Sequence, residues 1–196
     1  DSNAAILCAA IAETGGEPLA MGIFRDDEAI LAAALRAALA SADIVVMSGG
    51  TSKGAGDVSH RVLDGLGAPG VLVHGVALKP GKPLCLAAIG RVPVAILPGF
   101  PTSAIFTFHA FVAPVIRALA GLPRREETSV AARLSMRLPS ELGRTEYAMV
   151  SLAERDDGGL RAVPLGKGSG SVTAFSQADG FFAIPALDEG AETGQE

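Results

Sequence analysis

The sequence predicts an α/β protein: a three-layer α/β/α domain with a mostly parallel sheet, followed by a small, mostly antiparallel β barrel or sandwich. Two observations predict the first domain. Helix and strand patterns alternate up to about residue 122, and a long glycine-rich stretch joins one strand to one helix. The second domain is predicted by short alternating segments after Thr128, separated by Gly, Pro, Asp and Ser. We therefore place the two domains at residues 1–124 and 125–196.

The elements of the first domain follow one another in a regular order. A helix over residues 4–14, capped at its start by Ser2 or Asn3 and ended by glycines, precedes a strand over residues 17–23. A second helix opens at Asp26 and Asp27 and leads to an apolar strand over residues 43–47. The remaining expected elements are a helix over 58–66, a strand over 71–78, two apolar runs on either side of Gly90 that suggest a hairpin or adjacent strands, and a helix over 102–119 with a kink at Pro114.

Composition disfavours several classes of function. The 196 residues are 49% hydrophobic and 19% charged, which is enough apolar material for a sizeable core. A formal net charge of -5 and few aromatic residues disfavour nucleic acid as a partner. No leader pattern or long apolar span is evident, so we expect a cytoplasmic protein without a membrane partner. Cys8 and Cys85 lack metal-ligand spacing and are interpreted as buried free thiols.

The stretch from Ser48 to Asp57 is the strongest candidate for a ligand site. A strand that runs into glycines and then into a helix directs backbone N–H groups and the positive end of the helix dipole at one point, which suits phosphate. The spacing fits neither a P-loop nor the dinucleotide-binding fingerprint. Asp57 has two interpretations that the local sequence leaves open: it caps the following helix, or it holds a Mg²⁺ ion beside bound phosphate.

Two further turns have the composition of anion sites. Pro80, Gly81 and Pro83 fix a turn that presents Lys79 and Lys82. Residues 98–103 place Gly99 at a strand end and put Thr102 or Ser103 at the start of the last helix, where either could cap it. Because all three stretches follow strands, we expect them to converge at the carboxyl edge of the sheet.

These three stretches resemble the motifs of a known family. "SGGTSKGAGD" at residues 48–57, "HGVALKPGKP" at 74–83 and "LPGFPTSA" at 97–104 are similar to motifs of the MoeA/gephyrin family, the molybdopterin molybdotransferases. "GRTEYAMVSL" and "GSGSVTAFSQADGFFAIP" resemble the C-terminal β domain of that family, so the likeness covers nearly the whole chain. Family proteins carry a strand and two further domains before "DSN", which implies that the sheet here lacks its first strand.

The resemblance implies a reaction and a set of residues. Family members take adenylylated molybdopterin and molybdate and, with a divalent cation, insert molybdenum and release AMP. Positioning and charge neutralisation can supply most of such catalysis. The resemblance assigns a catalytic role to Asp57, Lys79 and Lys82, and a Mg²⁺ ion to Asp57. It assigns binding of pterin, phosphate or molybdate to Gly49, Gly50, Thr51, Ser52, Lys53, Gly54, Pro98, Gly99, Pro101, Thr102, Ser103, Arg144 and Ser169.

Two positions depart from the family pattern, and two alternatives to the transferase function stay open. The family usually has Asn where Phe100 stands and an apolar residue where Lys53 stands. The alternatives are a molybdopterin adenylyltransferase, which lacks the C-terminal β domain, and a noncatalytic pterin-binding or regulatory module. The resemblance also implies a homodimer in the full-length protein and a molybdopterin adenylyltransferase as a possible partner.

Overall fold

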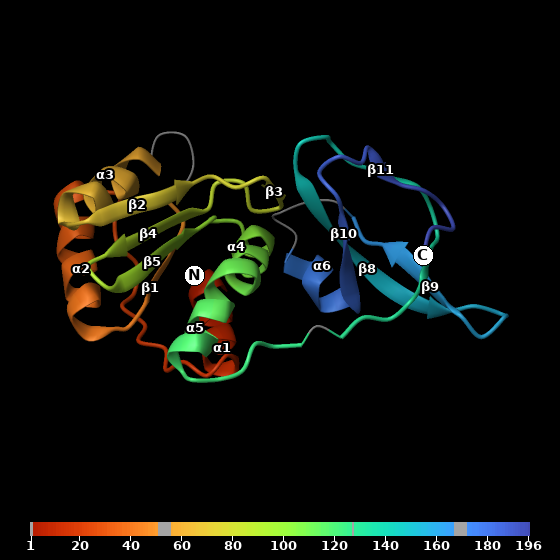
Figure 1. Cartoon of the computed structure of the whole chain (residues 1–196), viewed down its shortest axis with the longest axis horizontal. Helices are drawn as coiled ribbons and strands as arrows, with labels where there is room; N and C mark the ends of the chain where they lie inside the picture. Colours follow the sequence, from red (N-terminus) through yellow and green to blue (C-terminus); the bar gives the residue numbers. More distant parts are fainter. Residues whose placement is uncertain (1, 51–55, 127, 167–171) are drawn as a thin grey trace. The chain divides into compact units, whose positions relative to one another are not determined.

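The chain forms two compact units, which we describe separately. The computed structural model describes every residue except 1, 51–55, 127 and 167–171, drawn in grey in Figure 1. The first unit comprises Asp1–Val76 and Gly81–Arg125, and the second comprises Ala77–Pro80 and Glu126–Glu196. The second unit therefore takes four residues from the middle of the first.

The first unit alternates helices and strands. Its elements are α1 (Ser2–Glu13), α2 (Glu28–Ser41), β1 (Val45–Ser48), α3 (Gly56–Leu66), β2 (Pro69–His74), β4 (Cys85–Ile89), β5 (Val92–Leu97), α4 (Pro101–Thr107), the π-helical turn η1 (Phe108–Val112) and α5 (Ala113–Leu119). The side chain of Asp27 caps α2 by accepting a hydrogen bond from the backbone N–H of Ile30. The α/β class predicted from the alternating patterns is confirmed.

The sheet of the first unit has the order β1-β5-β4-β2. β1 is parallel to β5, whereas β4 is antiparallel to both β5 and β2. Three of its four described strands thus run in one direction and β4 runs against them. The predicted hairpin around Gly90 is the reason, because a two-residue connection can join only antiparallel strands.

Helices cover both faces of this sheet and give the predicted three layers (Figure 1). One hydrophobic cluster joins α1, α4, η1 and α5 to one face through residues such as Leu7, Phe108 and Leu97. The other cluster joins α2 and α3 to the opposite face through Leu35, Leu63 and similar residues. Leu63 and Phe108 are fully buried, so each cluster is centred on a large side chain under the sheet.

The strand expected at residues 17–23 is absent from the sheet. Residues 16–25 have no regular secondary structure, and Leu19, Met21 and Ile23 are all exposed. Their alternation has the period of a strand, but a strand also requires hydrogen bonds from a neighbour. Within the described residues β1 pairs only with β5, so no ladder reaches this segment. The prediction of a strand here was wrong.

The last helix of the first unit is interrupted near its middle. η1 ends two residues before Pro114, whose ring has no N–H to donate and excludes the carbonyl group of residue 110 from an α-helical bond. No long apolar span was expected from the sequence, but the run Pro101–Leu119 is long and apolar enough to cross a membrane by length and composition alone. Half of it is buried, with Phe108, Val112 and Ile116 in the first cluster, so it is a core helix.

The second unit is a small, mostly antiparallel β domain. Its elements are β3 (Leu78–Lys79), β6 (Arg133–Leu134), β7 (Leu138–Pro139), β8 (Thr145–Glu154), β9 (Leu160–Pro164), α6 (Val172–Gln177), β10 (Gly180–Ile184) and β11 (Gly190–Ala191). The long strand β8 pairs antiparallel with β10 and β9 and parallel with β3. β11 pairs with β7. A barrel was one of the two shapes expected for this domain. The described strands form open sheets and do not close into a barrel.

Cys85 provides a test of the core of the first unit. Its thiol lies on β4 and is almost fully buried, and burial, together with the negative charge of Asp64, raises its pKa to about 11. We expect Cys85 to resist Ellman's reagent at about pH 8 in the folded chain and to react once urea unfolds it.

The same pKa predicts an alkaline effect. Between the ordinary thiol pKa and about 11, the unfolded chain releases this proton while the folded chain keeps it, so the free energy of unfolding falls with rising pH. In the wild-type chain this proton makes the free energy of unfolding fall by up to roughly 1.4 kcal/mol per pH unit in this range, and we expect Cys85→Ala to lack that contribution. Identical slopes for the wild-type chain and the variant in pH-dependent urea denaturation would contradict the assignment.

Candidate functional site

The ends of four strands lie in one row across the sheet of the first unit. Met47 of β1 is opposite Ile96 of β5, Ile96 is opposite Cys85 of β4, and Cys85 is opposite His74 of β2. β1, β5 and β2 all leave the sheet just beyond this row, and β4 enters it there. The starts of the three glycine- and proline-containing stretches therefore share one edge, as the sequence predicted for strand ends of this direction.

Backbone contacts bring the first and third stretches together. The N–H of Gly49 donates to the carbonyl of Leu97 at 3.0 Å. A Cβ on Gly99 would stand 3.5 Å from the Cα of Gly49, so the two backbones pass close to each other. Gly49 and Gly50 both have positive φ angles, of 96° and 70°, which only glycine adopts easily. The glycines are thus required by the path of the chain at the sheet edge.

Asn3 ties these two stretches to α1. Its side-chain N–H₂ donates to the hydroxyl of Ser48 at 2.7 Å and to the carbonyl of Gly99 at 2.9 Å. The Ser48 hydroxyl in turn donates to the carbonyl of Pro98 at 3.3 Å. Asn3 is buried, and α1 supplies it from its first turn. The sequence suggests Asn3 only as a possible cap of this helix, whereas its side chain joins two distant stretches of the chain.

We predict that Asn3→Ala lowers the free energy of unfolding of the first unit by roughly 1 to 3 kcal/mol, because it leaves the Gly99 carbonyl and the Ser48 hydroxyl without their donor. Urea denaturation followed by circular dichroism at the helical minimum measures this, since α1–α5 belong to that unit. Ser2→Ala, at an exposed position in the same helical turn, is the matched control and should change little. Equal midpoints for the two variants would show that Asn3 does not hold this edge together.

The third stretch starts α4, but not as predicted. Phe100 is the N-cap residue and its side chain makes no cap hydrogen bond, while Pro101 takes the first helical position. Thr102 and Ser103 lie inside the first turn and are buried, so neither is the cap. The Thr102 hydroxyl has no hydrogen-bond partner among the described residues. A buried hydroxyl of this kind at a helix start can serve a ligand.

The two lysines of the second stretch belong to different units. Lys82 is exposed on the turn of the first unit, where its carbonyl accepts a hydrogen bond from the Val76 N–H at 2.9 Å. Lys79 belongs to the second unit because Leu78 and Lys79 form β3, which pairs with Thr145 and Glu146 of β8. The clamp expected from these two neighbouring lysines thus takes one residue from each unit.

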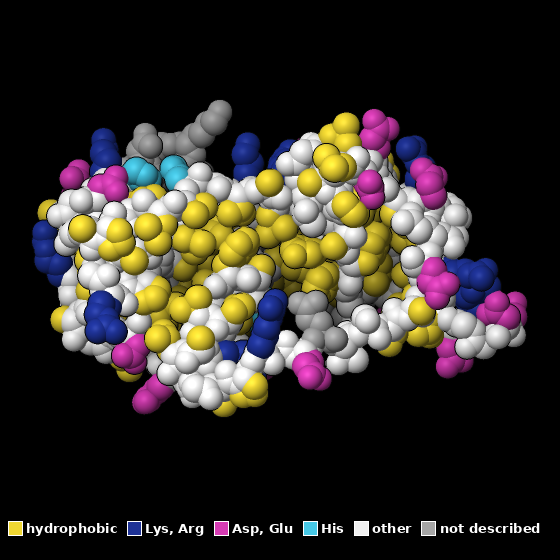
Figure 2. Space-filling view, in the orientation of Figure 1, with side chains coloured by type: hydrophobic (Ala, Val, Ile, Leu, Met, Phe, Trp, Pro, Cys, Tyr) yellow, Lys and Arg dark blue, Asp and Glu magenta, His cyan; other side chains and the backbone are white. Residues whose placement is uncertain are grey.

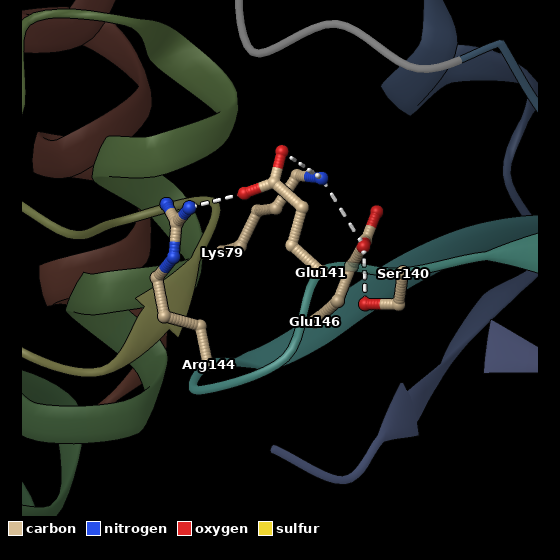
Figure 3. A network of polar contacts seen from close by, with 5 residues as sticks. All are labelled: Lys79, Ser140, Glu141, Arg144 and Glu146. Carbon is tan, nitrogen blue, oxygen red and sulfur yellow. Dashed lines mark hydrogen bonds and ion pairs between the residues drawn. The ribbon is translucent and has the colours of Figure 1, made fainter. Parts of the chain in front are cut away.

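A polar network surrounds Lys79 in the second unit (Figure 3). The ammonium Nζ lies 3.2 Å from Oε2 of Glu146 and 4.0 Å from Oε1 of Glu141. The Ser140 hydroxyl donates to Oε2 of Glu146 at 2.7 Å. Nη2 of Arg144 donates to Oε2 of Glu141. Lys79, a catalytic residue by resemblance, and Arg144, a binding residue by resemblance, therefore both contact Glu141.

Several predicted site residues lie outside the described part of the chain. These are Thr51, Ser52, Lys53, Gly54 and Ser169. The backbone of Asp57 lies in the first turn of α3, but the position of its side chain is likewise outside the description. No group of three or more His, Cys, Asp or Glu side chains suited to a metal occurs among the residues that are described.

Comparison with known proteins identifies both units. A family model described as a probable molybdopterin binding domain matches residues 1–118, more than half of the chain. The chain belongs to this family. A second model, described as the MoeA C-terminal region (domain IV), matches residues 131–196. The resemblance deduced from the three motifs and the tail is therefore confirmed.

Relatives of this molybdopterin-binding family agree with these matches. A molybdopterin molybdenumtransferase of Nostoc is 39% identical over 78% of this chain and 36% of its own length. One of Bacillus subtilis is 29% identical over the whole chain and 45% of its length. The crystal structure of a molybdopterin biosynthesis MoeA protein from Pyrococcus superposes with a TM-score of 0.79 at 38% identity, over 98% of this chain and 45% of that one. The chain thus spans less than half the length of these three relatives.

Proposed function

We propose that this chain carries out part of molybdenum cofactor biosynthesis, namely the insertion of molybdate into adenylylated molybdopterin with release of AMP. The observation that carries the proposal is the common sheet edge reached by Ser48, His74 and Leu97, where the three family motifs start. Relatives named molybdopterin molybdenumtransferases support the same reaction. The match of residues 131–196 to MoeA domain IV favours the transferase over an adenylyltransferase, since the small adenylyltransferases lack that domain.

The residues of the first unit have distinct roles in this proposal. The stretch from Gly49 to Gly54 is proposed to bind the phosphates and the pterin through backbone N–H groups, with the dipole of α3 adding to the attraction. The start of α4 is the second part of the proposed binding site. It comprises the buried residues Thr102 and Ser103 together with Pro98, Gly99 and Pro101. Exposed Lys82 is free of ion pairs among the described residues and is placed to attract an anionic substrate.

Asp57 fits a Mg²⁺ ion by its chemistry. A carboxylate is a hard oxygen ligand of the kind Mg²⁺ prefers, and a cation would relieve repulsion between Asp57 and a bound phosphate. Such an ion would supply charge neutralisation on the phosphate oxygens. The backbone of Asp57 lies in the first turn of α3, where the helix dipole favours a negatively charged residue.

In the second unit, Lys79, Arg144 and Ser169 are proposed to meet molybdate. Two cations near one tetrahedral dianion can hold it through several oxygens without forming a covalent bond. We also propose that the full-length protein is a cytoplasmic homodimer that can receive its substrate from a molybdopterin adenylyltransferase. The face shown in Figure 2 carries Lys and Arg side chains scattered among Asp and Glu, which gives it no continuous basic surface for nucleic acid.

An assay of AMP release tests the proposal. The chain is incubated with adenylylated molybdopterin, molybdate and Mg²⁺, and AMP is measured together with the molybdenum bound to the dithiolene. Molybdate-dependent AMP release is the expected result. AMP release without molybdate incorporation would overturn the transferase assignment. Substrate binding without any turnover would favour a noncatalytic pterin-binding module.

A further inference from the structure

Glu141 contacts two cations at once. It lies on the connection between β7 and β8, where one carboxylate oxygen faces Nζ of Lys79 at 4.0 Å and the other accepts a hydrogen bond from Arg144 (Figure 3). All three residues belong to the second unit. A bidentate carboxylate between a lysine and an arginine presents two negative oxygens to two donors, as a tetrahedral oxyanion would.

The two glutamates of this network differ in burial. The side chain of Glu146 is only 6% exposed, and it holds Lys79 at 3.2 Å and accepts from Ser140. The side chain of Glu141 is 63% exposed, although Lys79 and Arg144 beneath it are only 33% and 32% exposed. Glu146 is therefore a buried part of the domain, whereas Glu141 is exposed enough to turn into solvent and leave Lys79 and Arg144 uncovered.

The charges balance only while Glu141 is in place. Lys79 and Arg144 contribute two positive charges, and Glu141 and Glu146 contribute two negative charges, so the four groups sum to zero. When Glu141 turns away, the remaining three groups sum to +1. Arg144 then loses its ion pair with Glu141, and among the described residues Lys79 keeps its ion pair with Glu146. The position of the Glu141 carboxylate thus determines whether the net charge of this group of residues attracts an anion.

We propose that Glu141 is an internal competitor that occupies an oxyanion position between Lys79 and Arg144 and must swing out before an oxyanion binds there. The proposal rests on the proposed function for the identity of the anion, molybdate, but the contacts themselves suit any tetrahedral oxyanion. Glu141 is then a residue that sets affinity and selectivity: a bound anion must replace both of its oxygens, which favours a multidentate oxyanion over chloride.

The test is isothermal titration calorimetry of molybdate, and of sulfate, into the 196-residue chain at low ionic strength, where screening is least. We expect Glu141→Gln to bind both oxyanions roughly three- to tenfold more tightly than the wild-type chain, the range that two partly exposed ion pairs can supply. Glu141→Ala should change affinity in the same direction. Adding Arg144→Gln to Glu141→Gln should abolish the gain, because one of the two cations is then missing.

Asp157→Asn is the matched control. Asp157 is exposed and pairs with the half-buried Arg155 beyond the far end of β8, so the variant removes the same charge from the same unit at roughly 30 Å along the strand. Its oxyanion affinity should stay at the wild-type value. If Asp157→Asn gains as much oxyanion affinity as Glu141→Gln, the change in net charge alone explains the effect, and the proposal is overturned.

Two other outcomes would also overturn it: equal affinities for Glu141→Gln and wild type, or no oxyanion binding by either chain. The result is separable from the fate of the proposed function. If no AMP is released but Glu141→Gln still gains affinity for sulfate, the proposal that Glu141 competes with an oxyanion is supported, and only the assignment of molybdate as the natural anion fails. If AMP is released and Glu141→Gln gains nothing, the reaction stands without the competitor.

Discussion

Replacing Asp57 with Asn is expected to reduce Mg²⁺-dependent AMP release by a factor on the order of 100 or more, while the free energy of unfolding changes little. The reason is that Asn caps a helix nearly as well as Asp but is a far weaker ligand for a hard divalent cation. The variant therefore separates the two roles that the sequence leaves open for this residue at the first turn of α3.

The measurement compares AMP release across a Mg²⁺ titration for the wild-type chain, Asp57→Asn and Asp64→Asn. Asp64 lies two turns further along α3, on the solvent side, and pairs with Nδ1 of His60 at 3.3 Å. It controls for removing one negative charge from that helix. A rate and Mg²⁺ dependence in Asp57→Asn equal to those of Asp64→Asn would leave Asp57 with only the capping role.

Removing the carboxylate of Glu146 is the change with the largest expected effect on stability. We expect Glu146→Ala to lower the free energy of unfolding of the second unit by about 2 to 3 kcal/mol. The carboxylate is buried and accepts from both Lys79 and Ser140, so its removal leaves a partly buried ammonium with only the distant, exposed Glu141 as a partner in this network. Glu146→Gln keeps the shape and an acceptor for Ser140 and should cost less.

Tyr147 allows this measurement on the second unit alone. It is the single tyrosine of a chain without tryptophan, and its ring packs edge-on against Phe181 with 5.3 Å between ring centroids. Urea denaturation followed by tyrosine fluorescence therefore reports on β8 and β10. Glu154→Ala, at the exposed end of β8, is the control.

A double-mutant cycle with Lys79 completes the test. Lys79→Met combined with Glu146→Ala should cost less than the sum of the single changes, because the uncompensated ammonium is gone. Additive effects, or a cost for Glu146→Ala no larger than that for Glu154→Ala, would show that the Lys79–Glu146 pair does not stabilise the domain.

The amino-acid sequence by itself determined the fold class and the starts of the three motifs. Apolar runs with the period of helices and strands, broken by Gly and Pro, were enough to place β1, the β4–β5 hairpin and the helices on both faces of the sheet. These features depend on residues close in sequence, and the strand direction then places Ser48, His74 and Leu97 at one edge.

The tertiary structure decided what depends on partners far apart in the chain. Residues 17–23 alternate like a strand but have no ladder to join, since hydrogen bonds from a neighbour, not periodicity, make a strand. Asn3 reads as part of a helix start, yet it bridges residues 45 and 96 positions away. Lys79 and Lys82 are neighbours in the sequence and suggest a single anion clamp. The pairing of β3 with β8 makes Lys79 part of the second unit, where it forms an ion pair with Glu146. Local sequence carries no record of such pairings, because each is fixed by the burial and hydrogen bonding of both partners together.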